Sequence, residues 1–355
     1  MMPNRITRTR LAPAPLCALA VCLALAAPAA PTARQQVSQT QTPRAQPTPQ
    51  PSPAPSQPAE QPAVKFGFYV VDGSNHTVAD VRREDVSVTV DGAPQTVTYF
   101  AREESPVSYG LLVDNSGSMR QILDLLARTG GTLVAANRPE DEAFLMRFVD
   151  QAHTEILEDF TSDRQSLASA LSDMYTEGGL TAIIDAIHRA AGHLVAHAGG
   201  GRRLALVVIT DGEDRGSSHK LEELTQLLQR EGVRVFVIGL TGLLDNTGGG
   251  FIHRNSRGKA TTLLQTISAE SGGRAFFPTF GKTVGGELTD AVKEIGNSLR
   301  AQYVVGFTAA GAAADGKFHK VQIKIAEGSD KGKRKVVAAP VYSAPGGGAK
   351  QAGKE

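Results

Sequence analysis

Leu111-Leu112-Val113-Asp114-Asn115-Ser116-Gly117-Ser118 is the stretch that decides the fold of this 355-residue chain. Three consecutive apolar residues are followed at once by a polar segment that contains glycine. An apolar run without alternation is typical of a strand buried on both faces, because alternation is expected only where one face meets water. The stretch therefore predicts a central strand of a parallel sheet that ends in a polar loop.

The residues that follow repeat this arrangement of buried strand and helix. Leu204–Ile209 and Val233–Ile238 are further continuous apolar runs, and Phe144–Val149 with Thr154–Leu157 indicates a strand pair. Amphipathic helical patterns separate them, and a last short strand is expected at 274–277. The expected helices cover about 121–136, 166 onward, 182–195, 221–230, 261–271 and 286–299. This order predicts a mostly parallel sheet with helices on both faces.

The flanks of this region alternate between apolar and polar residues, which is typical of antiparallel strands. On the N-terminal side these strands are expected at 64–71, 86–90 and 96–100, and on the C-terminal side at 303–307, 321–325 and 336–337. Neither group has enough strands to be stable alone. We therefore expect the two groups to pair with each other.

The predicted fold class is α/β: a doubly wound, mostly parallel, Rossmann-like sheet inserted in a discontinuous β-sandwich. The expected domain organisation has six parts. They are a signal peptide at 1–33, a Pro/Gln-rich disordered linker at 34–63, the first part of the sandwich at 64–105, the inserted domain at 106–300, the second part of the sandwich at 301–343, and a flexible tail at 344–355.

The first 33 residues have the pattern of an export signal. Arg5, Arg8 and Arg10 precede an Ala/Leu-rich apolar stretch, and small residues follow it. We expect an exported protein that is periplasmic, displayed at the cell surface or secreted. A lipobox-like sequence at 19–22 leaves a lipid anchor open, so membrane contact is expected only through an uncleaved signal or such an anchor.

Composition excludes several functional classes. Both cysteines, Cys17 and Cys22, lie in the signal segment, so a processed chain has neither a disulfide nor cysteine-ligated zinc. The formal net charge is +1, and removal of three arginines and no acid with residues 1–33 gives 1 − 3 = −2. A nearly neutral chain without Trp gives no reason to expect a nucleic-acid partner.

Three polar clusters follow expected strands or precede expected helices. Asp114 to Ser118 follows the first strand, Gly178 to Thr181 precedes the helix at 182, and Thr210 to Asp214 follows the strand 204–209. In an open parallel sheet, ligands bind at the carboxyl ends of the strands. Each cluster alone also suits a helix cap or a turn. Together, at the ends of separate strands, they favour one metal site.

At these residues the sequence resembles the von Willebrand factor A family, whose metal-ion-dependent adhesion site has the pattern Asp-x-Ser-x-Ser with a distant Thr and a distant Asp. The resemblance covers about 106–300 and assigns the metal positions to Asp114, Ser116, Ser118, Thr181 and Asp211. Leu180 departs from the pattern, because many relatives have the Thr directly after the glycines. The resemblance implies a fold of this class and an ion that binds an acidic side chain of a partner protein.

The residue types also suit such an ion on physical grounds. Mg²⁺ prefers about six oxygen ligands in near-octahedral geometry and gives up water reluctantly, so hydroxyls and water-mediated carboxylates suit it. Hydroxyl ligands leave the ion electron-poor, so an open coordination position attracts an anionic oxygen. We expect Mg²⁺, with Mn²⁺ and Ca²⁺ as alternatives.

Two further features each have a functional and a structural interpretation. Residues 240–258 read as a Gly-rich loop at the same edge of the sheet, so Phe251, Arg254 and Arg257 are either a partner-binding rim or part of a solvated insertion. His193 and His197 lie four apart on one helix, where a solvated helix surface is favoured over a zinc site.

The sequence favours a metal-dependent protein-binding module of the adhesion or scaffold type over an enzyme. It contains neither a Gly-x-Ser-x-Gly elbow nor a phosphate-binding Walker loop. Two alternatives stay open: a metal-assisted hydrolase, and a structural scaffold whose metal site is vestigial.

Overall fold

The computed structural model describes residues 64–175, 178–197, 199–245, 250–279, 281, 283–300, 302–308, 316–326 and 333–343. The predicted signal peptide, linker and C-terminal tail lie outside these residues. None of the described helices has the length and apolar content that a bilayer crossing requires.

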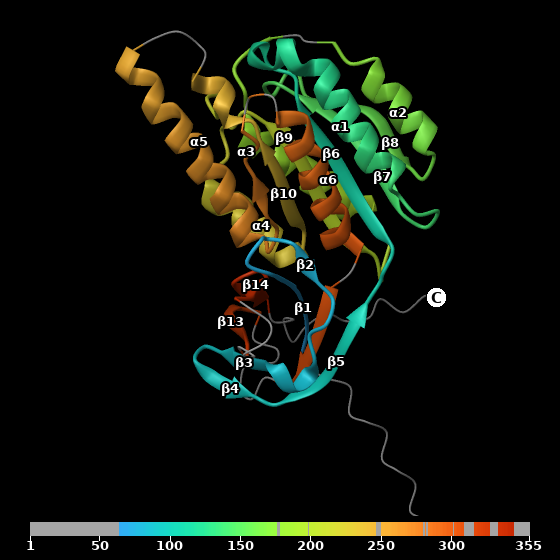
Figure 1. Ribbon diagram of the computed structural model, residues 1–355, viewed down its shortest axis with the longest axis vertical. Helices are drawn as coiled ribbons and strands as arrows, with labels where there is room; N and C mark the ends of the chain where they lie inside the picture. Colours follow the sequence, from blue (N-terminus) through green and yellow to red (C-terminus); the bar gives the residue numbers. More distant parts are fainter. Residues whose placement is uncertain are drawn as a thin grey trace, which may run out of the picture. The chain divides into compact units, whose positions relative to one another are not determined.

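The middle of the chain forms a six-stranded sheet of order β11-β10-β9-β6-β7-β8 (Figure 1). All neighbouring strands are parallel except the edge pair β7 and β8. The strands are β6 (Val107–Asp114), β7 (Glu142–Phe148), β8 (Glu155–Thr161), β9 (Arg203–Thr210), β10 (Arg234–Gly239) and β11 (Ala275–Phe276). The family of folds expected from the apolar runs, a mostly parallel α/β sheet, is therefore confirmed.

In the described part of the chain, six helices cover this sheet in two layers (Figure 1). Helices α1, α2 and α6 contribute to the core on one face, and α3, α4 and α5 to the core on the other. The helices are α1 (Leu123–Ala135), α2 (Arg164–Ser172), α3 (Ile183–His197), α4 (Leu221–Glu231), α5 (Gly250–Glu270) and α6 (Val284–Arg300). Three short 3₁₀ segments are η1 (Arg83–Asp85), η2 (Gly117–Ile122) and η3 (Thr241–Asp245).

Strand β6 shows why an unbroken apolar run marks the centre of the fold. All eight of its residues are buried, because β7 and β9 pair with its two edges and helices cover both faces. Leu111 and Val113 pack in one core, whereas Leu112 packs in the other. Burial of such side chains stabilises a fold by about 2 kcal/mol each.

The flanking segments build two antiparallel sheets that share one core. One sheet has the order β14-β1-β12-β5 with β2 beside β1, and the other has the order β15-β13-β3-β4. Their strands are β1 (Val64–Val71), β2 (Thr77–Val78), β3 (Val86–Val90), β4 (Ala93–Gln95), β5 (Val97–Glu103), β12 (Gln302–Phe307), β13 (Phe318–Ile325), β14 (Lys335–Val337) and β15 (Val341–Ser343). Each sheet thus contains strands from both ends of the described chain.

The prediction of a loop over residues 240–258 was wrong from residue 250 onward. Helix α5 begins at Gly250, eleven residues before the predicted start at Thr261. The run of glycines at 248–250 suggested a loop, but Ala260, Leu264 and Ile267 form a buried stripe at helical spacing. A helix fixed by such a stripe extends cheaply, because nucleation has already been achieved.

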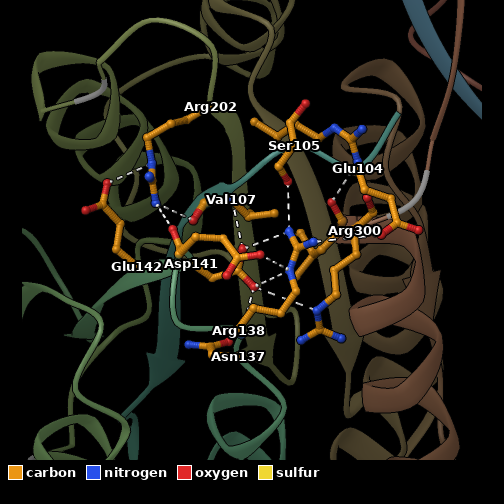
Figure 2. Close-up of polar contacts among 12 residues, drawn as sticks. Glu104, Ser105, Val107, Asn137, Arg138, Asp141, Glu142, Arg202 and Arg300 are labelled. Carbon is orange, nitrogen blue, oxygen red and sulfur yellow. Dashed lines mark hydrogen bonds and ion pairs between the residues drawn. The ribbon is translucent and has the colours of Figure 1, made fainter. Parts of the chain in front are cut away.

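A polar network fixes the chain where it enters β6 (Figure 2). The Asp141 carboxylate accepts hydrogen bonds from the backbone N–H groups of Val107, at 3.1 Å, and Arg138, at 3.0 Å. The Arg138 guanidinium donates to the same carboxylate and to the backbone oxygen of Ser105. Arg300, the last residue of α6, adds an ion pair to Asp141 at 3.8 Å. The network therefore joins the entry to the inserted domain with its exit.

Replacement of Asp141 with alanine is expected to lower the free energy of unfolding by about 3 kcal/mol, because it leaves a largely buried ion pair without its acid. Burial alone would raise the pKa of Asp141, but hydrogen bonds from Arg138 and Val107 hold it below its usual value. The contribution is therefore present at neutral pH and is lost as the pH falls through the lowered pKa. Urea denaturation measures the difference, and Glu140→Gln, which removes an exposed partner of Arg138, should cost less than about 1 kcal/mol. Equal effects of the two variants would contradict this assignment.

Candidate metal centre

Four of the five predicted metal residues meet at the carboxyl ends of β6 and β9. Asp114 is the last residue of β6, Ser116 and Ser118 lie in the turn that begins η2, and Asp211 directly follows β9. These two strands are neighbours in the sheet. The carboxyl ends of β6 and β9 therefore lie side by side, with Asp114 at one end and Asp211 at the other.

Hydrogen bonds connect these side chains into one cluster. The Ser118 hydroxyl donates to Asp211 Oδ2 at 2.6 Å, and the hydroxyls of Ser116 and Ser118 lie 3.0 Å apart. The backbone N–H of Ser116 donates to Asp114 Oδ1 at 2.9 Å. Asp114, Ser116 and Asp211 are buried, and Ser118 is partly exposed. The cluster thus has a buried floor and one side open to solvent.

Thr210, the first residue of the third polar cluster, supports Asp114 in a way that its sequence position did not predict. Its hydroxyl donates to Asp114 Oδ2 at 2.6 Å and accepts from the backbone N–H of Gly212 at 3.0 Å. Both oxygens of Asp114 are therefore held in fixed directions. The only sequence signal was a Thr directly before Asp211 at the end of a strand, which does not reveal a contact with Asp114.

Burial and mutual repulsion disfavour the charged forms of the two carboxylates. Burial, reinforced by the negative charge of Asp211, raises the pKa of Asp114 to about 7. Burial also raises the pKa of Asp211, against the hydrogen bond from Ser118. Within the described part of the chain, no Lys, Arg or His forms an ion pair with either acid. Buried charges without a counter-charge are costly, so the cluster favours a cation.

The donor set fits a hard divalent cation. It offers two carboxylates and two hydroxyls, and oxygen donors of this kind are those that Mg²⁺ and Ca²⁺ prefer. The described residues contain no group of three or more His, Cys, Asp or Glu that could hold a metal ion, and this cluster has only two residues of these types, Asp114 and Asp211. The set therefore differs from the imidazole- or thiolate-rich sites that hold zinc.

Thr181 lies in the neighbouring loop but outside the hydrogen-bonded cluster. It is buried, and its backbone oxygen accepts from the N–H groups of Arg215 and Gly216 at 2.9 and 3.0 Å. The N–H of Ala182 donates to Val149 at the end of β7, which fixes the loop beside the cluster. The Thr181 hydroxyl forms no hydrogen bond with a described residue.

The glycines before Thr181 have a geometric purpose. Gly178 and Gly179 have φ angles of +84° and +136°, which L-residues with a side chain rarely adopt. A Cβ on Gly179 would lie 2.6 Å from Val149 Cγ1. These glycines let the loop turn back over the end of β7 and reach the site, with Gly178 close to Gly117.

Two exposed apolar side chains flank the cluster. Tyr175 and Leu180 are each 57% exposed, unlike nearly all large apolar side chains among the described residues. Tyr175 is tied to the site, because its backbone oxygen accepts from Asn115 Nδ2 at 2.6 Å. The Arg147 guanidinium lies 4.5 Å from the Tyr175 ring centroid and donates to its hydroxyl. Tyr175 and Leu180 thus present apolar surface beside the open side of the cluster.

The predicted rim of Phe251, Arg254 and Arg257 is only partly placed. The backbone of all three belongs to α5, but the side chains of Phe251 and Arg254 lie outside the described residues. Arg257 is exposed, one turn before Ala260, which packs near Gly212. Their role as a rim stays a prediction.

His193 and His197 contact an aromatic ring. Both rings stack on Phe160, with centroid distances of 5.1 and 3.7 Å. His193 also contacts Asp159, and His197 contacts Glu142. Each histidine thus has its own acidic partner, and the pair does not share one.

About half of the chain matches a known family model. Residues 110–284 match the family model described as von Willebrand factor type A domain. No curated protein matches the chain. Similar solved structures include an aerotolerance-related membrane protein from Bacteroides fragilis NCTC 9343, with 23% identity over 54% of this chain and 98% of that chain and a TM-score of 0.43. The conserved hypothetical protein BatB from Bacteroides thetaiotaomicron has 21% identity over 54% of this chain and 100% of that chain, with a TM-score of 0.42. A von Willebrand factor type A protein from Catenulispora acidiphila has 12% identity over 81% of this chain and 75% of that chain, with a TM-score of 0.42.

Proposed function

Because residues 110–284 of the chain are a von Willebrand factor type A domain, we propose that this protein is an exported binding module that uses a divalent cation to hold a partner protein. Domains of this family are generally protein-interaction modules. Asp114, Ser116, Ser118 and Asp211 would hold the ion, and Mg²⁺ suits this donor set best. The ion would supply a positive charge that attracts an Asp or Glu side chain of the partner.

The observation that carries the proposal is the pair of buried acids Asp114 and Asp211, neither of which forms an ion pair with a described Lys, Arg or His. Asp114 and Asp211 repel each other in a place where burial already disfavours their charges. Neutral hydroxyls of Ser116 and Ser118 complete the set, so a bound divalent ion would keep much of its charge. Such an ion still attracts an anionic oxygen.

The chain also supplies a surface on which a partner can rest. Tyr175 and Leu180 lie exposed beside the open side of the cluster, and apolar contact around a central polar anchor is typical of protein interfaces. Thr181, buried next to Leu180, presents a hydroxyl that no described residue uses. We assign it to the ion when the partner is bound.

Capture from envelope extract tests this function. The immobilised full chain should retain a partner in Mg²⁺, release it in EDTA, and regain it when Mg²⁺ or Mn²⁺ is restored, because the ion is the link between the two proteins. Asp114→Ala should retain nothing, and Asp124→Ala, which removes an exposed acid from α1, should behave like the natural chain. A partner that stays bound in EDTA would instead support binding through the sandwich, with a vestigial ion site.

The apolar rim adds a second comparison within the same assay. Leu180→Ser should weaken partner capture by about tenfold, because an exposed Leu buried in an interface contributes between 1 and 2 kcal/mol. Calorimetric Mg²⁺ affinity should not change, because the side chain does not support the cluster. Loss of both partner and ion would indicate that Leu180 shapes the site and does not contact the partner.

A further inference from the structure

A cavity of about 450 Å³ lies where the β-sandwich meets the amino ends of the parallel strands β9 and β10. Its walls come from the start of β1, the starts of β9 and β10, the end of α4, and the strands β12 and β15. The candidate metal centre lies at the carboxyl ends of the same parallel strands. The length of the strands therefore separates the cavity from the candidate metal centre.

The lining of this cavity is strongly basic. It includes five cationic residues and one acidic residue: Lys65, Arg202, Arg203, Arg230, Arg234 and Glu231. Arg202 forms an ion pair with Glu142, and Arg230 with Glu231. In the described part of the chain, Lys65, Arg203 and Arg234 have no carboxylate within ion-pair distance. The cavity thus has three positive charges that are not matched locally.

Arg234 and Gln302 present unused hydrogen-bonding groups at one point of the wall. Arg234 Nη2 donates to the backbone oxygen of Gly67 at 2.8 Å, its only hydrogen bond to a described residue. A guanidinium has five N–H donors, so four remain. The Gln302 side-chain amide has no hydrogen bond to a described residue, and both side chains line the cavity.

Gly67 makes room for these two groups. A Cβ at this position would lie 2.8 Å from Gln302 Oε1 and 2.9 Å from Arg234 Nη2. Any larger residue would therefore push the guanidinium and the amide away from the wall. The absence of a side chain in β1 and the convergence of the two groups are parts of one arrangement.

Arg203 adds a second guanidinium close to the first. Its Nη1 donates to the backbone oxygens of Leu299 and Arg300, and its Nη2 donates to the backbone oxygen of Glu103. Burial, followed by repulsion from Arg234, lowers the pKa of Arg203 to about 10. The Glu103 and Glu104 carboxylates attract Arg203 only from beyond ion-pair distance. Two neighbouring guanidiniums that share no acid attract an anion from solution.

We infer that this cavity binds a small divalent oxyanion of the phosphate class. Arg234 and Gln302 donate hydrogen bonds to it, and Arg203 and Lys65 supply positive potential. Guanidinium groups favour phosphate because their paired N–H donors match its oxygens. The aliphatic and aromatic parts of the wall, which include Leu228 and Tyr342, leave space for the organic part of a phosphate monoester.

Calorimetric titration of the full chain with inorganic phosphate tests this inference. Phosphate should bind at one site and raise the melting temperature, whereas chloride at equal ionic strength should not, because screening alone does not require the cavity. Glycerol phosphate should bind at least as well as inorganic phosphate if the natural ligand is an ester. Absence of phosphate binding beyond the effect of chloride would overturn the inference.

Three variants locate the binding. Arg234→Gln should weaken phosphate binding by about tenfold, which corresponds to one charge-assisted hydrogen bond. Gly67→Ala should weaken phosphate binding through displacement of Arg234 and Gln302. If either of these variants fails to fold, Lys65→Gln, at an exposed position, replaces it and should also weaken phosphate binding. Arg230→Gln is the matched control, because its guanidinium is already paired with Glu231, and it should bind phosphate like the natural chain. Phosphate binding that Arg234→Gln leaves intact and Arg230→Gln removes would place the anion elsewhere.

Discussion

Replacing Asp114 with alanine should reduce Mg²⁺ affinity by on the order of 100-fold, the upper range for residues that fix a metal site through hydrogen bonds. Asp114 lies at the centre of the cluster, since its carboxylate accepts hydrogen bonds from the hydroxyl of Thr210 and the backbone N–H of Ser116. Without it, the turn that carries both serines loses its anchor and the site loses half of its negative charge. Calorimetric titration of the full chain with MgCl₂ measures the change.

A graded series separates ligand residues from supporting residues. Ser118→Ala removes a hydroxyl that contacts Asp211 and should lower the Mg²⁺ affinity strongly. Thr210→Val keeps all four proposed ligand residues and should lower the Mg²⁺ affinity by about tenfold. Asp124→Ala is the control for the loss of one acid. Circular dichroism should show that each variant keeps its helices and sheet. Magnesium affinity that survives Asp114→Ala in a folded protein would contradict the proposed site.

The metal-free protein should become less stable as the pH rises from about 4 to about 8, the reverse of ordinary acid denaturation. The pKa of Asp114 is raised from 3.8 to about 7, so the folded state holds a proton that the unfolded state releases. This contribution to stability is full below the unfolded pKa and is lost as the pH passes through the folded pKa. A difference of roughly three pKa units corresponds to on the order of 4 kcal/mol.

Magnesium should reverse this dependence, because the ion binds the deprotonated form of the site and stabilises the folded state by mass action. Urea denaturation of the natural chain at both ends of this pH range, with EDTA and with MgCl₂, measures the two slopes. Asp114→Asn should flatten the slope in EDTA and remove the response to Mg²⁺. Asp141 and Asp185 have pKa values that are lowered by hydrogen bonds that outweigh burial, so their contribution to stability is lost in acid. The comparison with Asp114→Asn therefore isolates the contribution of the candidate metal centre. An unchanged slope in Asp114→Asn would show that the site is not the source.

The amino-acid sequence by itself determined the α/β class, the strand order along the chain and the grouping of Asp114 with Asp211 at the carboxyl ends of two strands. Apolar runs at 111–113, 204–209 and 233–238 were enough, because a strand buried on both faces is a local property of composition. The ends of such strands lie at one edge in any parallel sheet. Asp114 and Asp211 could therefore be placed together before their neighbours were known.

Tertiary structure alone decided which side chains touch and how far α5 extends beyond its predicted start. The hydrogen bond from Thr210 to Asp114 depends on the register of β6 against β9. Helix α5 begins at Gly250, within a segment whose glycines predicted a loop. The basic cavity combines Gly67, Arg234 and Gln302 from three distant strands, none of which carries a motif. Patterns in the sequence report periodicity over a few residues, whereas these contacts join residues that lie far apart in the sequence, such as Thr210 and Asp114 at a separation of 96 and Arg234 and Gly67 at a separation of 167. Such residues meet only when the sheets and helices pack.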